Sequence, residues 1–372
     1  MSDRIFLEFC SDGKTWKKVE HFLSYSLEAD LYIADHAFSV ELANPEIAIT
    51  KGAQCRLHVN DKLELTGIVD RRFRRCDKQG KKQVVEGRDL MGLIVDSCAE
   101  QFVSVEGKTL KQLAEMLLKD VPFINRAAIE YQQNLVGKLK SRKGNQAAFG
   151  LAALWDTGER VAQIHPGMTK FQVLQMYAMS RGQMFFSLPD GTFVFGRPLV
   201  GGDPDFTIVF NQEGLGNNAL SAEVEENISK CYSKVIVVGQ QQGNPIDGND
   251  VGKRNVSSKP VYDPTFPFYK PFVQVSYNDS QTPQQHARLI LEKARHDGFR
   301  LVYELPRHSP DGANNYTINR IASVQDDVHD VHGDFLVSGR TFKLDKGNGP
   351  TTTLKLSPPG LVEDGTLAKG HK

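Results

Sequence analysis

Residues 54–69, QCRLHVNDKLELTGIV, alternate apolar and polar side chains on either side of the turn pair Asn60-Asp61. A period of two is typical of a half-buried strand, and two such runs joined by two polar residues predict a β-hairpin. Further strand-like runs lie at 4–9, 23–29, 38–42 and 84–85. The first hundred residues therefore predict a small antiparallel β-barrel or sandwich.

Three stretches have helical spacing and helix-terminating residues. The first begins at Thr109 and stops before Pro122, and the second begins with the capping box Thr169/Gln172. The third has Pro283 at the first helical position and covers residues 283–297. Strand-like runs return at 229–239, 299–305, 316–324, 334–344 and 351–357.

Strands and helices are grouped along the chain and do not alternate throughout, which argues against a doubly wound sheet. We expect an α+β fold with two β-barrel-like domains joined by a helix-and-hairpin region, and an inserted α+β lobe. The expected domains are a β-barrel at 1–98, an α/β connecting domain at 99–217, a discontinuous second β-barrel at 218–240 and 316–358, an inserted lobe at 241–315 with its helix at 283–297, and a flexible tail at 359–372.

The charge balance restricts the function. Lys plus Arg and Asp plus Glu both number 45, so the chain lacks the basic excess of a dedicated duplex-DNA binder or a polybasic membrane-surface protein. No apolar stretch approaches the roughly 20 residues that cross a bilayer. The five cysteines are scattered and form no CxxC motif, as expected for reduced thiols in a soluble protein.

No catalytic or cofactor-binding motif was found: a GxSxG elbow, an HExxH motif and a phosphate loop are all absent from the sequence. The best metal candidates are His329 and His332, spaced i and i+3 among the four carboxylates Asp326, Asp327, Asp330 and Asp334. An acidic, solvated hairpin turn explains the same residues without a metal. We therefore expect no metal and no cofactor.

Residues 70–88 carry eight basic and three acidic side chains, a local charge of +5. Four of the basic residues are Arg71, Arg72, Arg74 and Arg75. A charged hairpin edge that deters strand pairing is one interpretation. Contact with an acidic partner subunit or with passing nucleic acid is the other.

Several short motifs occur in one order along the chain. They are Thr66-Gly67-Ile68-Val69-Asp70, Gly87-Arg88-Asp89-Leu90, 93–99 (LIVDSCA), 165–171 (HPGMTKF) and 229–240 (SKCYSKVIVVGQ). Together they resemble the Mu-type baseplate hub family of contractile-tail phages and prophages, over about residues 1–358. Met168 stands where the family usually has an acidic residue. A second Gly-Arg pair, Gly339-Arg340, hints at a duplicated β unit.

The resemblance implies a structural protein and not an enzyme. It implies a homotrimer whose six β-barrels form a ring, joining the six-fold tail tube to the three-fold central spike. Its other implied partners are further baseplate proteins, with the tape-measure protein and DNA passing transiently through an axial channel. It also implies assembly in the bacterial host cytoplasm, a final place in the virion tail baseplate, and no membrane insertion.

Two alternatives remain open at this point. One is a tail-associated peptidoglycan hydrolase, although no inserted region is long enough for a separate lysin domain. The other is a spike or tube component of a contractile secretion system, although a spike would append a long β-helical C-terminus. Within the hub hypothesis, we expect the arginines at 71–75 and the aspartates at 326–334 to lie at an interface between subunits or at the channel.

Overall fold

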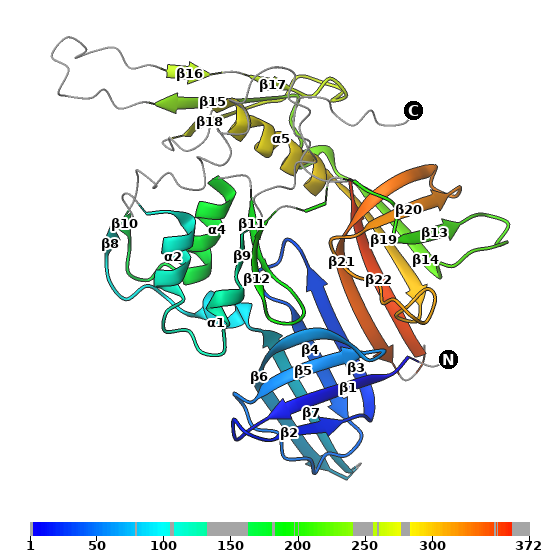
Figure 1. The fold of residues 1–372 in the computed structure, drawn as a ribbon. Helices are drawn as coiled ribbons and strands as arrows, with labels where there is room; N and C mark the ends of the chain where they lie inside the picture. Colours follow the sequence, from blue (N-terminus) through cyan, green and yellow to red (C-terminus); the bar gives the residue numbers. More distant parts are fainter. Residues whose placement is uncertain are drawn as a thin grey trace.

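The computed structural model describes residues 3–78, 80–104, 108–131, 163–180, 183–196, 198–199, 201–240, 256–258, 260–276, 283–345, 347 and 349–358. The expected tail at 359–372 lies outside these residues. Within the described part of the chain, no helix is long and apolar enough to span a membrane. Figure 1 shows the described elements as a β-rich body with a helical region on one side and a lobe above.

Seven strands form the first β unit, and each pairs antiparallel with its neighbours in the order β3-β4-β7-β6-β5-β1-β2. The predicted hairpin is confirmed as β5 and β6, and both turn residues, Asn60 (φ 49°) and Asp61 (φ 62°), are left-handed, as a two-residue hairpin turn requires. The strands are β1 Ile5–Cys10, β2 Trp16–Val19, β3 Phe22–Asp30, β4 Ala37–Leu42, β5 Gln54–Val59, β6 Lys62–Asp77 and β7 Gly80–Asp89.

Six strands form the second β unit. Four of them pair antiparallel in the order β14-β19-β22-β21, β20 pairs antiparallel with β21, and β13 pairs parallel with β20. The strands are β13 Phe206–Phe210, β14 Ser221–Glu226, β19 Phe299–Pro306, β20 Ile321–Asp326, β21 Val331–Asp345 and β22 Gly349–Ser357.

The two β units join edge to edge. Residues 339–344 of β21 pair antiparallel with residues 25–30 of β3, so all the strands of both units belong to one 13-stranded sheet. The expectation of a β-rich chain is confirmed. The expectation of two barrels joined by a helix-and-hairpin region needs correction, because the described strands of the two units pair directly and close neither unit into a barrel.

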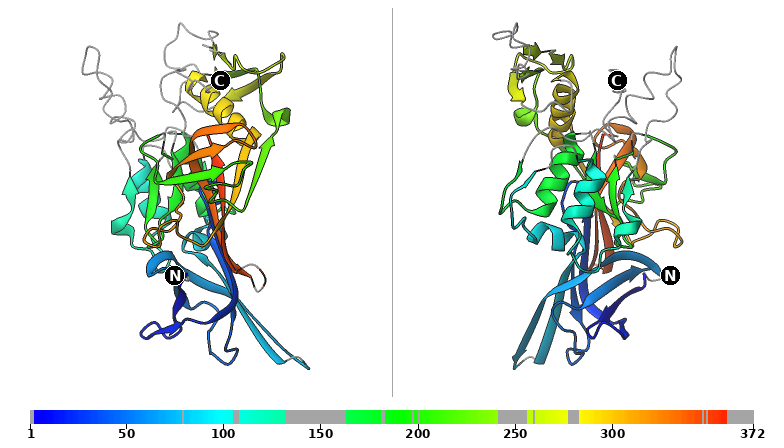
Figure 2. Two further views of the ribbon diagram at one scale, coloured as in Figure 1. Left: turned by 90° about the vertical axis from the view of Figure 1, so that its right-hand side faces the viewer. Right: turned by 60° about the vertical axis from the view of Figure 1, so that its left-hand side comes forward.

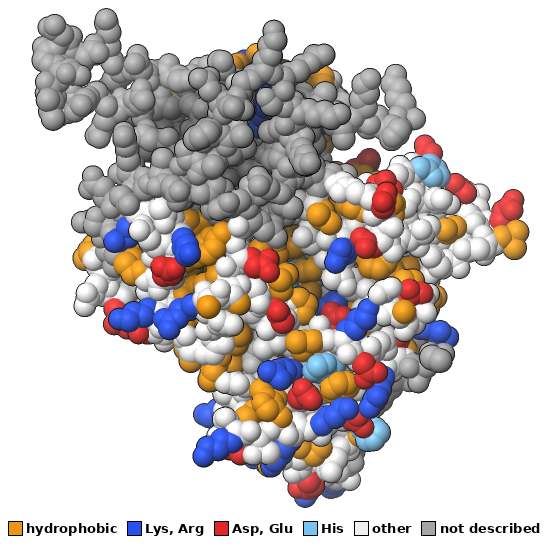
Figure 3. Space-filling model, viewed as in Figure 1, with side chains coloured by type: hydrophobic (Ala, Val, Ile, Leu, Met, Phe, Trp, Pro, Cys, Tyr) orange, Lys and Arg blue, Asp and Glu red, His pale blue; other side chains and the backbone are white. Residues whose placement is uncertain are grey.

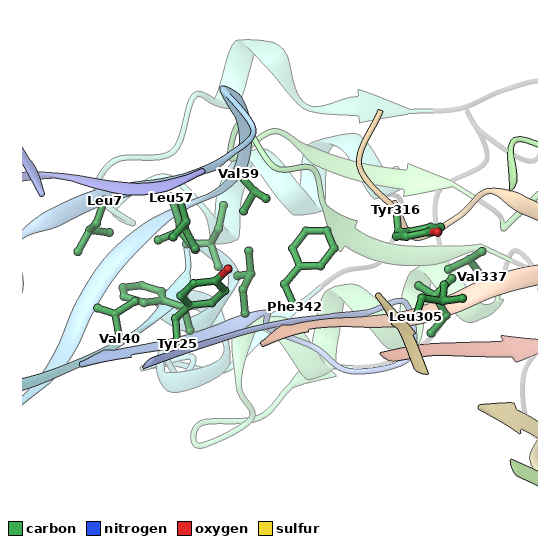
Figure 4. Close-up of a cluster of buried hydrophobic side chains, with 14 of the residues drawn as sticks. Leu7, Tyr25, Val40, Leu57, Val59, Leu305, Tyr316, Val337 and Phe342 are labelled. Atoms are coloured by element: carbon green, nitrogen blue, oxygen red, sulfur yellow. The ribbon is translucent and has the colours of Figure 1, made fainter. Parts of the chain in front are cut away.

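One hydrophobic core explains why the sheet is continuous. The paired residues Leu27 and Phe342 are both fully buried, and they belong to a single cluster that extends from Leu7 to Leu356 across both units. In Figure 4, Phe342 lies between apolar side chains of the first unit and those of the second. Burying each such side chain contributes about 1.5–3 kcal/mol, so separating the units would expose a large apolar surface.

The connecting region packs three α-helices and two small sheets around a core of its own. The capping box expected at Thr169 is present, with Gln172 as its partner. The helix expected to begin at Thr109 also starts with a capping box, formed with Gln112. Its elements are α1 Met91–Asp96, β8 Val103–Ser104, α2 Leu110–Leu117, η1 Arg126–Ala128, β9 Glu130–Tyr131, β10 Gln163–Ile164, α4 Lys170–Ser180, β11 Met184–Ser187 and β12 Phe193–Gly196.

The inserted lobe places one helix on a four-stranded sheet. Its elements are η2 Ile228–Lys230, β15 Lys234–Gln240, β16 Val256–Ser258, β17 Val261–Tyr262, β18 Pro271–Ser276 and α5 Pro283–Gly298. The strand β15 was expected in the second β unit, but Val235 and Val237 are buried against Ala287 and Leu291 of α5. Conversely, β19 was expected in the lobe, but it pairs with β14 and β22 and buries Tyr303 in the main core.

Candidate functional site

The basic segment at 70–88 is a hairpin formed by the second half of β6 and by β7. It extends away from the rest of the first β unit, as both views in Figure 2 show. The strand β5 ends its pairing at Ile68, so beyond that point β6 pairs only with β7. We call residues 70–88 the basic hairpin. Because side chains alternate along a strand, its four clustered arginines are divided between two faces.

Arg71 and Arg75 lie on one face of the basic hairpin, with Phe73 between them. The Arg71 Nη1 is 3.0 Å from a Glu86 carboxylate oxygen, and the Arg75 Nε is 2.7 Å from Asp77. Both arginine side chains remain about two-thirds exposed (64% and 65%), and Phe73 is 40% exposed. Solvent-exposed ion pairs contribute only about 0–1 kcal/mol, so these groups are available to a partner at little cost.

Arg72 and Arg74 lie on the other face, over the loop that follows β4. The Arg72 Nη1 donates to the carbonyl oxygen of Ile49 at 2.7 Å. Lys81 pairs with Glu46 at 2.5 Å, and the hydrogen bond and charge of Lys81, with a smaller contribution from Arg74, lower the pKa of that carboxyl. These contacts hold one face of the hairpin against the loop that follows β4, and Arg72 is partly structural for that reason.

The acidic segment at 326–334 forms the turn between β20 and β21. Asp326 is fully buried and accepts hydrogen bonds from the backbone N–H groups of Val328 and His329, both at 3.0 Å, and from the Tyr303 hydroxyl at 2.8 Å. Burial opposes ionisation, yet the hydrogen bonds from His329 and Tyr303 hold the pKa of Asp326 below its usual value. We expected Asp326 at an interface or at the channel, but its side chain is buried and stabilises the turn through these hydrogen bonds.

The other three carboxylates, those of Asp327, Asp330 and Asp334, are exposed. We call residues 327–334 the acidic turn. Figure 3 shows acidic side chains and a histidine gathered at this end of the molecule, and Lys and Arg frequent over the first β unit. The acidic turn and the basic hairpin lie at opposite ends of the sheet (Figure 1), so their opposite charges do not meet within one copy.

The two candidate metal ligands contact different carboxylates. The His329 Nδ1 is 2.9 Å from Asp326, and its ring stacks on Phe210. The His332 Nε2 lies 3.6 Å from Asp327 and 3.8 Å from Asp330. Within the described ranges, no group of three or more His, Cys, Asp or Glu side chains is arranged to hold a metal ion.

The motif Gly87-Arg88-Asp89 has a structural explanation that its sequence pattern did not reveal. A Cβ on Gly87 would overlap the Ile68 carbonyl oxygen and the Phe38 ring, so only glycine fits. Arg88 binds three carboxylates, with 2.7 Å to Asp70, 3.1 Å to Asp35 and 2.5 Å to Asp96. These partners raise the pKa of Arg88 and tie β6, β7, the turn after β3 and α1 together.

Asp89 joins the first β unit to the connecting region. Its buried carboxyl accepts a hydrogen bond from the Ser187 hydroxyl of β11 and another, at 3.1 Å, from the Met91 backbone N–H. Burial raises the pKa of Asp89 to about 7. His36 lies 3.7 Å away, and burial lowers its pKa to about 4.

The second Gly-Arg pair, Gly339-Arg340, lies in β21 and joins the two β units. The Arg340 Nη1 is 2.5 Å from the Glu64 carboxylate of β6 and donates to the Tyr316 carbonyl oxygen at 3.2 Å. The same carboxylate accepts a hydrogen bond of 2.6 Å from the Asn315 side chain. Each Gly-Arg pair therefore supplies an arginine to a carboxylate network that joins separate parts of the fold.

Residues 7–89 match the family model for the N-terminal domain of Mu phage GpP-like baseplate assembly proteins. Over 324 residues the chain is 20% identical to the baseplate hub protein gp44 of Escherichia phage Mu, covering 83% of this chain and 76% of that protein. Both matches support the resemblance to the Mu-type baseplate hub and tail protein family.

Two solved structures share the fold of this chain. A tail protein from Neisseria meningitidis MC58 has a TM-score of 0.76 and 22% identity, covering 96% of this chain and 97% of that one. The 43 kDa tail protein of prophage MuSo2 from Shewanella oneidensis has a TM-score of 0.73 and 18% identity, covering 96% and 99%. These relatives of the Mu-type family are structural tail and baseplate proteins, which confirms the prediction of a structural, non-enzymatic protein.

Proposed function

We propose that this protein is a trimeric hub on the axis of a contractile phage tail. In this proposal it joins the tail tube to the central spike and encloses an axial channel for the tape-measure protein and then DNA. It is made in the host cytoplasm and becomes part of the virion baseplate. The family supports the baseplate assignment, since the Mu relative is named as a baseplate hub protein.

The observation that carries the channel proposal is a sheet with two different faces. One face is the core, where Leu27, Phe38, Phe342 and Leu354 are buried. The opposite face, which we call the polar face, is partly exposed and has small polar residues across its middle: Ser26, Ser39, Thr341 and Thr353. Since charge on this face is mixed (Glu28 and Glu41 beside Lys343 and Lys355), a DNA backbone would meet no continuous basic track.

The number of β units suits the proposed partners. Two β units in each chain give six around a trimer, which matches a six-fold tube on one side while the trimer itself matches a three-fold spike on the other. The contacts between β21 and β3 fix the two units rigidly relative to each other, because they share both strand pairing and core. Such rigidity suits a protein that converts one symmetry into another.

Contacts between copies would use the opposite charges described above. We assign the arginines Arg71, Arg72, Arg74 and Arg75 of one copy to an interface with the acidic side of the next. The acidic turn contributes Asp327, Asp330 and Asp334 to that side, whereas Asp326 is excluded by its burial. Contacts of this head-to-tail kind close into a ring when the rotation between copies permits it.

Solution mass tests the proposal. Sedimentation equilibrium over a wide concentration range should find a species of about 125 kDa, three times the 41.5 kDa of one chain. Assembly should weaken as salt rises, because screening reduces the attraction between the exposed charges. A strict monomer at every concentration, or a dimer that no longer associates, would contradict the ring.

A further inference from the structure

The connecting region has a hydrophobic core separate from that of the main sheet. This core is built mainly from side chains of α1, α2, α4 and the β11–β12 hairpin, and Ile68 is the one described residue of the first β unit that packs against it. A part of a protein with its own core can open away from its neighbour while both parts stay folded. The contacts at the boundary, which we call the joint, therefore decide how firmly the two parts are held together.

The β11–β12 hairpin closes the joint through two contacts. Its turn reaches the end of β7 (Figure 1), where a Cβ on Gly191 would come within 3.0 Å of the Leu90 Cδ1 and 3.4 Å of the Thr66 side chain. The Ser187 hydroxyl of β11 donates to the Asp89 carboxyl, and these two residues are only 4% and 2% exposed. The joint is thus held by an apolar contact at the turn and by a hydrogen bond to a buried carboxyl.

Neutral donors bind the Asp89 carboxyl. Besides Ser187, the Met91 backbone N–H of α1 donates to it at 3.1 Å. A carboxylate that has left water needs a counter-charge as well as hydrogen bonds, and without one it retains its proton to a higher pH. Burial accordingly raises the pKa of Asp89 to about 7. Above that pH the closed joint holds an uncompensated buried charge.

The charged groups described around Asp89 supply no counter-charge. Arg88 of β7 is bound to three other carboxylates, and one of them, that of Asp35, adds a negative charge that also raises the pKa of Asp89. His36, in the turn after β3, lies 3.7 Å from Asp89, but burial and the charge of Arg340 lower its pKa to about 4. At neutral pH, His36 is therefore uncharged and cannot compensate an ionised Asp89.

We propose that Asp89 is a pH-sensitive latch between the connecting region and the first β unit. While Asp89 is protonated, the joint stays closed. When Asp89 loses its proton, the β11–β12 hairpin separates from the end of β7 more often, because separation returns the carboxylate to water. Both parts stay folded, since each keeps its own core. The latch lies within one chain, so it does not depend on the proposed ring.

Thiol labelling of the full-length protein tests the latch. The substitution Thr66→Cys puts a thiol in place of a buried hydroxyl at the joint, so a pyridyl disulfide reagent reaches it when the joint opens. Mass spectrometry of the labelled peptide measures the rate. This rate, divided by the rate in the same variant carrying Asp89→Asn, should rise about tenfold from about pH 6 to about pH 8. The division removes the pH dependence of the thiol and of His36, which both proteins share.

Two controls separate the latch from a purely structural contact. The native thiol of Cys55 is fully buried in the main core and reports unfolding of the first β unit, so it should react more slowly than the thiol introduced at position 66. The variant Ser187→Ala loses the hydrogen bond but leaves Asp89 free to titrate. Its joint should open about fivefold more often at about pH 6, and the rise towards about pH 8 should remain.

Each outcome decides the proposal. A rate ratio that does not change with pH would show that Asp89 is no latch. Equal labelling of Cys55 and of the introduced thiol at about pH 8 would show that the first β unit unfolds and that no separate joint opens. If Thr66→Cys does not fold, Leu90→Cys probes the same contact with Gly191 and should give the same tenfold rise of about pH 6 to about pH 8.

Discussion

Arg340 of β21 and Glu64 of β6 form a buried ion pair 276 residues apart in sequence, with 2.5 Å between Nη1 and the carboxylate oxygen. Their side chains are only 2% and 5% exposed. The pair lies where the two β units meet, beside the contact in which the Tyr25 hydroxyl is 2.7 Å from the His308 ring. Polar groups from both ends of the chain thus fix how the units are joined.

Removing one partner of this pair should be costly. Glu64→Ala leaves the Arg340 guanidinium buried without its counter-charge, and we expect a loss of about 3–5 kcal/mol in the free energy of unfolding. Urea denaturation measures this value. Glu86→Ala removes the exposed partner of Arg71 and should cost no more than about 1 kcal/mol. Equal losses in the two variants would show that the buried pair has no special role.

Asp326 and Asp330 should differ sharply although both belong to the same acidic run. Asp326→Ala leaves the Val328 and His329 N–H groups and the Tyr303 hydroxyl without their acceptor, and we expect it to destabilise the protein by about 2–4 kcal/mol. Asp330→Asn changes only a fully exposed side chain and keeps a residue that tolerates the left-handed backbone here (φ 56°), so it should lie within about 0.5 kcal/mol of wild type. Thermal unfolding of both variants is the measurement, and a larger effect at Asp330 would contradict the assignment.

Asp89 should make the protein less stable as pH rises. Its pKa is near 7 in the folded protein and about 4 in the unfolded chain, so the folded state keeps a proton that the unfolded state has lost. Its stabilising contribution is present below about pH 4 and is lost as pH rises through 7, with a slope of at most about 1.4 kcal/mol per pH unit. His36 has the opposite effect. Because burial lowers its pKa to about 4, it makes the protein more stable as pH rises from about 4 to 6.5.

The substitution Asp89→Asn isolates this contribution because an amide does not ionise. The difference in unfolding free energy between the Asp89→Asn variant and wild type should shift in favour of the variant from about pH 5 to about pH 8. Urea titrations at each pH measure the shift. Asp334→Asn, at an exposed carboxylate, is the control and should show no such trend. A pH-independent difference for Asp89→Asn would contradict the raised pKa.

Reversing the charge of the basic hairpin should weaken assembly. The variant Arg71→Glu, Arg72→Glu, Arg74→Glu, Arg75→Glu should raise the trimer dissociation concentration at least about tenfold at about 50 mM salt, and less at about 500 mM. Sedimentation velocity at both salt concentrations is the measurement. The matched control makes the same charge change at the exposed residues Lys14, Lys17, Lys111 and Lys119. Unchanged assembly, or an equal loss in the control, would exclude the hairpin from the interface.

Local features of the fold were predictable because neighbouring residues encode them. The turn Asn60-Asp61, the helix start at Thr109 and the capping box at Thr169 depend on side chains within a few positions of each other, and all three are present. The ordered motifs also pointed to the correct family. However, an alternating pattern does not show which strands pair with each other. Strand pairing depends on which apolar faces are buried together in the folded protein.

The errors follow from this limit. Val235 and Val237 of β15 have the same alternating pattern as Leu301 and Tyr303 of β19. The two strands nevertheless enter different cores, each in the place expected for the other. Asp326 resembles its three acidic neighbours in sequence, but Tyr303 lies opposite it only after β19 and β20 have assembled. The pairing of β3 with β21 joins residues about 300 positions apart. A pattern among neighbouring residues cannot predict such a pairing.

That long-range pairing has a consequence for how the chain is made. At ribosomal rates of roughly 5–20 residues per second, β3 leaves the ribosome about 15–60 seconds before β21 exists to cover it. During that interval the nascent first β unit has an open strand and an incomplete core, and on a polysome many such units lie near one another. We therefore expect the yield of this protein in the cell to depend on the speed of synthesis and on chaperones, as well as on the stability of the finished fold.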